Sequence, residues 1–268
     1  MNTTFGFIGT GNMGSALARS AAKALTPDQM LLSDSYAPVA EKVAQELGCK
    51  AVSVETVAKS AGFVFLGVKP QVMQTMLSGI APVLKQRTDD FVLVSMAAGV
   101  AISDIRRMAG GDYPVIRIMP NIPVSVGGGV ILFDATENVP QAAVDCFQKT
   151  MAHAGLIDRL PEKLIDAGSA LSGCGPAFVS LFVEALADGA VACGLPRAQA
   201  LQFAAQTVEG TAKMLLESGQ HPGQLKDAVC SPGGSTIAGV AALEQGAFRA
   251  SVMEAVASAY QRTLELGK

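Results

Sequence analysis

The sequence predicts an α/β fold in two parts, a doubly wound sheet followed by an all-helical region, and two observations carry this prediction. Between residues 4 and 158, short apolar runs alternate with stretches of helical periodicity, which is typical of a parallel sheet with crossover helices. After Leu160 the segments become long and Ala-rich, with few β-branched runs. We therefore place a domain boundary near residue 160, which gives domains of residues 1–159 and 160–268.

Short apolar segments of the first domain are expected to form the strands of the sheet, and the one near Ala51 is the weakest. The predicted strands are Thr4–Ile8, Met30–Ser33, the segment near Ala51, Gly62–Gly67, Phe91–Ser95, Val115–Met119, Gly129–Phe133 and Gly155–Asp158. The helices between them are bounded by Pro or Gly and include Asn12–Ala24, Pro38–Leu47 and Pro70–Leu84.

The second domain is expected to be built around one apolar helix, Pro176–Cys193, which is interrupted by Ser180, Glu184 and Asp188 at every fourth position. A helix of this kind is buried on nearly every side. The following helix and the last helix each carry one apolar stripe, formed by Leu201, Ala205, Val208, Ala212 and Leu215 and by Phe248, Val252, Ala255 and Ala259. Because so few residues cannot surround the apolar helix alone, we predict an intertwined helical dimer.

The composition argues against nucleic acid and membrane partners. The 268 residues are 50% hydrophobic and 16% charged, so part of the surface is expected to be covered by another subunit. With a net charge of -3 and no Lys/Arg-rich run, the expected partner is a small molecule and not nucleic acid. Polar residues interrupt every apolar run before it reaches membrane-spanning length, and no signal-peptide pattern is present, so we expect a cytoplasmic protein with no membrane association.

Neither a disulfide framework nor a metal site is predicted. His153 and His221 lie far apart without acidic companions at ligand spacing, and both are interpreted as structural. The cysteines lack any CxxC spacing and are expected to be reduced and mostly buried; they are Cys49, Cys146, Cys174, Cys193 and Cys230.

A glycine-rich loop follows the first predicted strand and opens the first predicted helix. In that context the pattern GxGxxG is typical of a dinucleotide-binding domain of the Rossmann type. Gly9 permits the tight turn, Gly11 lets the backbone approach a pyrophosphate, and Gly14 lets helix and strand pack closely, with the phosphate facing the helix N-terminus. The predicted coenzyme-binding loop is therefore Gly9, Thr10, Gly11, Asn12, Met13 and Gly14.

The end of the second predicted strand leaves the choice of dinucleotide open. Asp34 stands twenty positions after Gly14, where an acid bonds a ribose 2′-hydroxyl and favours NAD. The flanking Ser33 and Ser35 can instead donate hydrogen bonds to a 2′-phosphate, as in NADP. An ordinary solvated or helix-capping role for Asp34 is equally compatible with the sequence.

Two later strand ends are expected to line the same crevice, because ligands of doubly wound sheets bind at the carboxyl edge. In Val68-Lys69-Pro70, the lysine can reach a phosphate or ribose, although a lone loop lysine is also compatible with simple solvation. Ala97 and Ala98 offer small side chains and a close backbone, which suit a flat nicotinamide ring or a plain turn.

The second domain contains a loop suited to a carboxylate, directly before a helical segment. Its two glycines free backbone N–H groups at the helix start, and its hydroxyl side chains add donors, although a capped helix start has the same pattern. A similar loop opens the apolar helix, and a rigid turn after the predicted strand Val115–Met119 carries an asparagine able to bond substrate or backbone. The predicted substrate-binding residues are Ser231, Gly233, Gly234, Ser235, Thr236, Ser172 and Asn121.

Together these motifs resemble the pyrroline-5-carboxylate reductase family over nearly the whole chain. The most specific segments are 221–227 and 231–236, and the others are 7–14, 68–70, 97–99, 119–121 and 172–177. The resemblance implies a Rossmann domain followed by an all-helical dimerisation domain, with the active site at the dimer interface. It also implies that dimers assemble further, commonly into decamers.

Two residues depart from the family pattern. Cys174 stands where the family usually has Ser or another small residue, which is a mild change in side-chain size. Asp34 stands where many relatives that favour NADPH carry an uncharged or basic residue. We expect NADPH as the coenzyme, with NADH as the alternative.

The reaction that the resemblance implies is the reduction of Δ1-pyrroline-5-carboxylate to L-proline by NAD(P)H, the last step of proline biosynthesis. The imine nitrogen is basic enough to arrive protonated, so the protein mainly orients two rings and holds the substrate carboxylate. By hypothesis Thr236 is the catalytic residue and bonds either the ring nitrogen or the carboxylate, while the N–H groups of Gly233 to Thr236 bind the carboxylate.

Two other functions are compatible with a Rossmann domain and a helical partner domain. A β-hydroxyacid dehydrogenase should carry a catalytic lysine soon after the Ser-Gly loop, and the residues that follow Gly173 contain none. A non-catalytic redox sensor would bind the dinucleotide without turnover. Consumption of NAD(P)H in the presence of Δ1-pyrroline-5-carboxylate distinguishes the sensor from the reductase.

Overall fold

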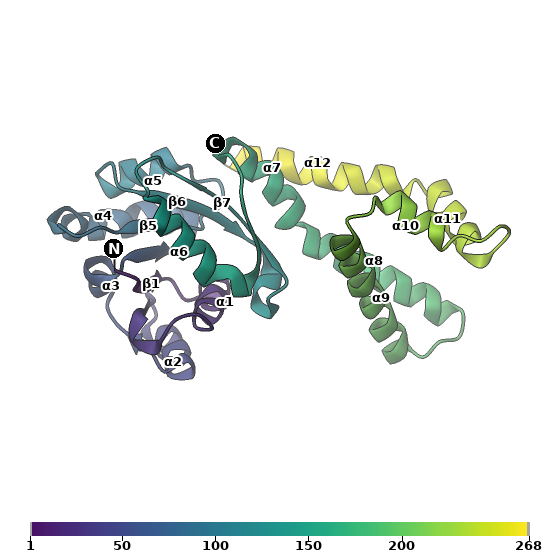
Figure 1. Ribbon diagram of the computed structural model, residues 1–268, viewed down its shortest axis with the longest axis horizontal. Helices are drawn as coiled ribbons and strands as arrows, with labels where there is room; N and C mark the ends of the chain where they lie inside the picture. The colour runs from purple at the N-terminus through teal and green to yellow at the C-terminus, as the bar shows by residue number, and fades with distance from the viewer. Residues whose placement is uncertain (1, 267–268) are drawn as a thin grey trace. The chain divides into compact units, whose positions relative to one another are not determined.

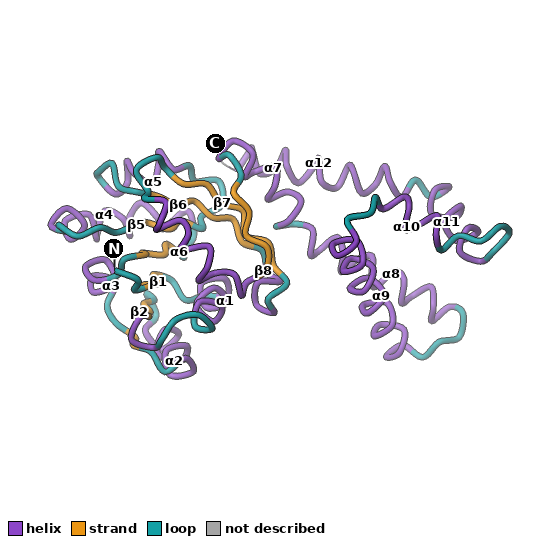
Figure 2. Tube along the Cα trace, viewed as in Figure 1, coloured by secondary structure: helices purple, strands orange, loops and turns teal. Residues whose placement is uncertain are grey.

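The computed structural model describes residues 2–266, which divide into two compact units. The first unit runs to Gly173 and includes the C-terminal segment from Tyr260, and the second is Cys174–Ala259. The described strands all lie in the first unit, whereas the second contains only helices and loops (Figure 2). The division of the chain into domains 1–159 and 160–268 stays a prediction. The boundary between the two compact units falls somewhat later in the sequence, after helix α7 (Glu162–Ser172).

The first unit is organised by an eight-stranded sheet in the order β3-β2-β1-β4-β5-β6-β7-β8, which confirms the predicted fold class. Neighbouring strands are parallel except β6 and β7, which run antiparallel. The strands are β1 (Phe5–Ile8), β2 (Met30–Ser33), β3 (Lys50–Ala51), β4 (Phe63–Leu66), β5 (Val92–Ser95), β6 (Val115–Pro120), β7 (Gly129–Ala135) and β8 (Gly155–Arg159).

Helices cover both faces of the sheet, as the doubly wound prediction requires (Figure 1). Helices α1 (Asn12–Ala21), α2 (Ala37–Leu47) and α6 (Gln141–Met151) pack on one face, where the rings of Phe5, Phe7, Phe63 and Phe65 form a buried cluster. The other face is covered by α3 (Val54–Ser60), α4 (Pro70–Gln86) and α5 (Ile102–Ala109), and by α7 over β6 and β7. Short 3-10 turns are η1 (Pro27–Gln29), η2 (Ile122–Val126) and η3 (Ala152–Ala154).

Local sequence signals account for most helix ends. Helices α2 and α5 stop at Gly48 and Gly110, whose positive φ angles of 68° and 76° suit glycine. The Ser53 hydroxyl caps α3 by accepting a hydrogen bond from the Thr56 N–H at 3.1 Å. Helix α1 ends three residues before the predicted Ala24, because the chain tightens into a turn in which the Ala24 N–H donates to the Ala21 carbonyl.

The second unit consists of helices, and α8 packs on α9 through the buried residues Ala187, Ala200 and Ala204. The prediction that α8 is buried on nearly every side was wrong for the single chain, since Ala187 is its one fully buried residue. The buried positions of α9 also lie one residue before the predicted stripe from Leu201, which is 42% exposed. The elements are α8 (Gly175–Ala192), α9 (Arg197–Ser218), α10 (Pro222–Ala228), α11 (Ser235–Gln245) and α12 (Phe248–Leu266).

One helical stretch, Glu162–Ala192, is apolar enough by length and composition to cross a membrane. Its best 18-residue window has a mean hydropathy of 1.5, and 11% of that window is buried in the chain. This corrects the expectation that every apolar run is too short, because the polar residues that interrupt the stretch do not offset its many Ala, Val, Leu and Phe side chains. The expectation of mostly buried cysteines was also wrong: Cys193 is exposed and the other four are half-buried free thiols. Cys146 lies within α6, whereas the others lie at helix ends or in loops.

Candidate active site

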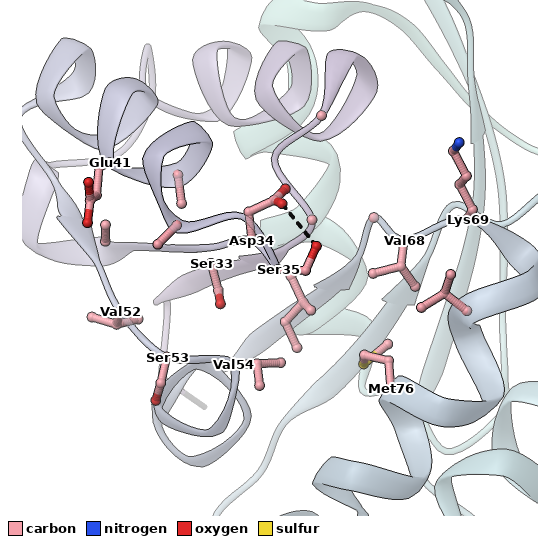
Figure 3. A pocket seen from close by; sticks show the side chains of 18 of the residues that line it. Ser33, Asp34, Ser35, Glu41, Val52, Ser53, Val54, Val68, Lys69 and Met76 are labelled. Atoms are coloured by element: carbon pink, nitrogen blue, oxygen red, sulfur yellow. Dashed lines mark hydrogen bonds between the residues drawn. The ribbon is translucent and has the colours of Figure 1, made fainter.

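The first unit contains a cavity of about 760 Å³ at the carboxyl ends of β1, β2, β3 and β4. It is lined by the strand-end residues Gly9, Gly11, Ser33, Asp34, Ser35, Val68 and Lys69, which the sequence predicted as coenzyme-binding. In Figure 3, Asp34 and Ser35 lie between Glu41 on one side and Val68 and Lys69 on the other. The parallel strands therefore bring these residues together at one edge of the sheet, because their carboxyl ends all point the same way.

The glycines of the loop after β1 have the geometry that a tight, closely approached turn requires. Gly9 has a φ of 96°, and a Cβ there would lie 2.6 Å from the Gly67 carbonyl oxygen. A Cβ on Gly14 would lie 2.0 Å from the Gly9 carbonyl oxygen, so only glycine lets α1 start this close to β1. A Cβ on Gly11, in contrast, would meet nothing within 4 Å, because Gly11 faces open space at the start of α1. Such a bare, open backbone position can accept a ligand phosphate at a helix N-terminus.

The remaining loop residues differ in burial. Thr10 is 1% exposed, and its backbone N–H and hydroxyl donate to the Asp34 Oδ2 atom at 2.8 Å and 3.3 Å. Asn12 and Met13 form the first turn of α1, where Asn12 is exposed and Met13 half-buried. Thr10, Asn12, Met13 and Gly14 are not among the residues that line the cavity itself.

The loop after β4 reaches the same cavity. Lys69 is exposed and precedes the first residue of α4, Pro70, which fixes the helix start. Val68 and Lys69 line the cavity, whereas Pro70 does not. Lys69 is thus the one cation among the lining residues of the described chain, opposite the carboxylates of Asp34 and Glu41.

The loop after β5 lies outside the cavity. Ala97 is 2% exposed, its N–H lies 3.4 Å from the Ser95 hydroxyl that accepts its hydrogen bond, and Ala98 is exposed. Neither alanine is a lining residue, so the structure does not bring this pair together with the other predicted coenzyme residues around one cavity. Their contact with a nicotinamide ring stays a prediction.

Several lining residues were missed by sequence reasoning. Ser53 and Val54 follow β3, which was too short and weak to be given a strand end. Glu41 lies on α2, and Thr75 and Met76 lie on α4, on helix faces that strand-end reasoning does not consider. The carboxyl-edge rule applied to the weak segment near Ala51 would have found Ser53 and Val54.

Asn121 and Ser172, both predicted to bind substrate, are brought together by a hydrogen bond. The Asn121 Nδ2 atom donates to the Ser172 carbonyl at 2.9 Å, and its Oδ1 atom accepts from the Val130 N–H at 2.8 Å. The Ser172 hydroxyl donates to the Gly168 carbonyl within α7 at 3.0 Å. Of the two roles left open for Asn121, the structure therefore shows the backbone one, and this side chain ties the end of α7 to the start of β7.

The predicted carboxylate loop of the second unit forms a turn at the start of α11. Gly233 has a φ of 68°, Gly234 immediately precedes the helix, and the Gly234 N–H donates to the Ser231 carbonyl at 3.0 Å. Ser235 and Thr236 are exposed and occupy the first turn of an 11-residue helix. The loop thus presents hydroxyl groups and helix-end N–H groups to the exterior of the described chain.

The neighbouring α10 carries the site's resolved pKa shift. The Asp227 carboxylate accepts a hydrogen bond from the Lys226 ammonium at 2.5 Å, which raises the pKa of Lys226 above its ordinary value. The predicted structural role of His221 agrees with its position, since its Nδ1 atom caps α10 by accepting from the Gly223 N–H.

Within residues 2–266 no group of three or more His, Cys, Asp or Glu side chains could hold a metal ion.

Comparisons with known proteins cover both parts of the chain. The family described as "NADP oxidoreductase coenzyme F420-dependent" matches residues 4–99, and the family described as "Pyrroline-5-carboxylate reductase dimerisation" matches residues 162–266. The chain is 41% identical to the pyrroline-5-carboxylate reductase of Escherichia coli over 275 aligned residues, which span 100% of both chains.

Solved structures give the same result. A pyrroline-5-carboxylate reductase from Coxiella burnetii is 30% identical with a TM-score of 0.92 over 100% of both chains. The Plasmodium falciparum pyrroline carboxylate reductase, crystallised with NADP bound, is 31% identical with a TM-score of 0.87 over 100% of this chain and 99% of that chain. The family resemblance is confirmed over the full length, and the chain belongs to the pyrroline-5-carboxylate reductase family.

Proposed function

We propose that this chain reduces Δ1-pyrroline-5-carboxylate to L-proline, with NADPH as the coenzyme and NADH as the alternative. The observation that carries the proposal is the glycine-rich loop of residues 9–14, which lies at the edge of a cavity of about 760 Å³ in a chain of this family. The NADP bound to the Plasmodium falciparum relative supports the choice of coenzyme. The β-hydroxyacid dehydrogenase alternative lacks its expected lysine after Gly173.

The residues of the cavity fit a dinucleotide. Gly11 leaves open space where a side chain would otherwise stand, and the N-terminus of α1 suits a pyrophosphate. Ser33 and Lys69 offer donors around the cavity for the ribose and its substituents, and the Ser35 hydroxyl offers one in exchange for its long bond of 3.4 Å to Asp34. We propose that Ala97 and Ala98 contact the nicotinamide, which supplies the hydride when the coenzyme is bound.

The turn before α11 is proposed to hold the substrate carboxylate. The N–H groups of Gly233, Ser235 and Thr236 lie at a helix start with its partial positive charge, whereas the Gly234 N–H donates to the Ser231 carbonyl. The Ser231 and Ser235 side chains add hydroxyl donors. Thr236 is proposed to donate to the carboxylate or to bond the ring nitrogen. Since the imine nitrogen arrives protonated, the C=N carbon needs only to be held toward the hydride donor. Hydride addition gives a neutral secondary amine, which then takes a proton from water to become the ammonium.

A turnover assay tests the reaction. Purified protein with Δ1-pyrroline-5-carboxylate should oxidise NADPH, and a parallel assay with NADH measures the coenzyme preference. Binding of either coenzyme without turnover would overturn the reductase proposal in favour of a dinucleotide sensor.

A Thr236→Ala variant tests the proposed catalytic residue. Loss of one or two hydrogen bonds to the substrate should lower kcat/KM by about tenfold or more. Thr211→Ala is a matched control, because the Thr211 hydroxyl donates within α9 to the Thr207 carbonyl at 2.7 Å. An unchanged kcat/KM in Thr236→Ala would remove this residue from the mechanism.

We propose that the protein is cytoplasmic.

We propose that the chain forms a homodimer and that the dimers associate into a decamer. An apolar groove of about 540 Å³ lies between α8 and α12, with Phe178, Phe182 and Phe248 among its lining residues. It falls within the segment matched by the dimerisation family, and most of α8 is uncovered in one chain. A second copy of the same helices would cover this surface, which explains a membrane-like hydropathy without a membrane.

A further inference from the structure

The carboxylate at the end of β2 does not stand free in the cavity. The Asp34 Oδ2 atom accepts from the Thr10 N–H at 2.8 Å and from the Thr10 hydroxyl at 3.3 Å. Its Oδ1 atom accepts from the Tyr36 N–H at 3.0 Å and from the Ser35 hydroxyl at 3.4 Å. Figure 3 shows the Asp34–Ser35 contact. An ionised carboxylate has about four lone-pair positions, so these four donors occupy its acceptor capacity.

The other end of this contact is Thr10, near the start of the glycine-rich loop. Thr10 is 1% exposed and lies between Gly9 and Gly11, so its buried N–H needs an acceptor. A second link joins the same two segments, because the Gly9 N–H donates to the Ser33 carbonyl at 2.8 Å. The end of β2 therefore holds the loop through one backbone bond and one carboxylate.

We propose that Asp34 is a positioning residue that fixes the loop 9–14 through Thr10 and takes no part in distinguishing NADH from NADPH. The inference rests on the proposed function only in that a dinucleotide binds to the loop. A ribose ligand needs a free acceptor directed at the sugar, and both oxygens of Asp34 are already engaged. The same engagement compensates the negative charge locally, so the carboxylate is compatible with a 2′-phosphate nearby.

Asp34→Asn is the primary test, because asparagine keeps the shape and has one acceptor oxygen. Its NH2 group must then face a backbone donor, either the Thr10 N–H or the Tyr36 N–H. The dissociation constants of NADPH and NADH, measured from nicotinamide fluorescence without substrate, should both rise by about fivefold to tenfold, the scale of one lost charge-assisted bond. Their ratio should stay within about twofold of the wild-type ratio.

Two competitors locate the effect along the ligand. ADP-ribose carries the pyrophosphate, so Asp34→Asn should raise its dissociation constant by the same factor as those of the coenzymes. Adenosine 2′-monophosphate carries a 2′-phosphate and no pyrophosphate, and its dissociation constant should not change. Asp28→Asn, which removes an exposed acid outside the cavity lining, is the matched control and should leave all constants unchanged.

A selective effect would overturn the inference. If NADH binding weakens while NADPH binding is unchanged or tightens, or if adenosine 2′-monophosphate binding tightens, Asp34 is a ribose ligand or a charge that repels the 2′-phosphate. If all constants are unchanged, the bond to Thr10 does not position the loop. A wild-type protein that binds neither coenzyme would refute the proposed function instead, whereas binding without turnover leaves the Asp34 test intact.

Thr10→Ala covers the case in which Asp34→Asn fails to fold. It keeps the backbone bond and removes only the hydroxyl donor at 3.3 Å. The dissociation constants of NADPH and NADH should therefore rise equally, by a smaller factor than in Asp34→Asn. Where both variants fold, the effect of Thr10→Ala should shrink in the Asp34→Asn background, because the two groups act through one contact. Additive effects, or weakening of one coenzyme only, would count against the inference.

Discussion

At the scale of single residues, the three glycines of the coenzyme loop are required for different reasons. Gly9 and Gly14 are confined by neighbouring backbone, whereas Gly11 is bare because it faces open space. The sequence pattern was sufficient to predict the tight turn at Gly9 and the close packing at Gly14, since both follow from a strand, a turn and a helix in that order. The approach of a pyrophosphate to Gly11 stays a prediction. The partner of Asp34 could not be predicted, because spacing alone does not reveal which donor a flexible carboxylate selects.

Gly14→Ala and Gly11→Ala should separate folding from binding. A Cβ on Gly14 would be forced against the Gly9 carbonyl, so we expect a loss of about 1–3 kcal/mol in the free energy of unfolding. Gly11→Ala should leave that free energy unchanged and raise the NADPH dissociation constant by about tenfold, because its methyl group occupies the phosphate approach. Urea unfolding and coenzyme fluorescence measure the two quantities. Equal unfolding midpoints for Gly14→Ala and wild type would contradict the packing argument.

At the scale of elements, the short linkages between strands and helices determine how the loops are held. Asn121 joins β7 to the end of α7. Buried Arg117 on β6 donates to Glu162 at 3.2 Å and to Asp166 at 2.8 Å, both on α7. Glu162 also accepts from the Ile102 N–H at the start of α5. These polar contacts hold α7 on the sheet, which explains why the first compact unit extends beyond residue 160.

Asn121→Ala should destabilise the first unit. It leaves the Val130 N–H and the Ser172 carbonyl without their partner, at a cost of about 1–3 kcal/mol in the free energy of unfolding. Ser125→Ala is a suitable control in the same region, because Ser125 is exposed and its hydroxyl bonds only the nearby Ile122 carbonyl. A loss of stability no larger than that of the control, measured by urea unfolding, would show that the bridge is dispensable.

The turn after α4 should make stability depend on pH. Hydrogen bonding to the Arg87 guanidinium, and then its charge, holds the pKa of Asp89 below the ordinary value of 3.8. Because this pKa is lower in the folded state, the ionised carboxylate stabilises the folded protein at every pH above the ordinary pKa. The contribution is lost as the pH falls through the folded-state pKa.

Asp89→Asn measures this contribution. The stability difference between wild type and Asp89→Asn should be present at neutral pH, shrink as the pH falls below 3.8, and vanish once the pH is below the folded-state pKa. Asp90→Asn gives the effect of removing a neighbouring exposed carboxylate. A difference that is constant from neutral to acid pH would contradict the role of the Arg87 contact.

Strand positions were predicted well because each parallel strand is a short apolar run between turn residues. Met30–Ser33 agrees at both ends, and the others differ by one or two residues. Strand direction was not predictable at β7, since hydrophobic periodicity is the same for parallel and antiparallel neighbours. The exposure of α8 was missed because an apolar perimeter records burial in the final assembly and not in one chain.

At the scale of the whole molecule, the second unit is incomplete as a single chain. Leu181 and Phe248 line the groove and are 68% and 38% exposed, and Val252 beside them is 44% exposed. Apolar exposure of this extent on packed helices is typical of a surface that another subunit covers. The low charged content noted in the sequence has the same explanation.

Leu181→Glu should therefore weaken self-association. A carboxylate in the groove must be desolvated when a second copy covers it, so light scattering should show smaller species at a given protein concentration. Leu216→Glu is the matched control, because Leu216 is 84% exposed and lies outside the groove. If both variants keep the wild-type mass, the groove is not the contact between subunits.

The mutual approach of Gly9 and Gly67 has a practical consequence for protein engineering. A Cβ on either residue would lie 2.6 Å from the carbonyl oxygen of the other, so any mutation at one position must be accommodated by the opposite loop. Combinatorial libraries that seek altered coenzyme use should keep both positions fixed, together with the helix cap Ser53, and diversify Ser35 and Glu41, which are exposed and line the cavity. The varied positions would then be ones that can contact the ligand, and fewer variants would misfold.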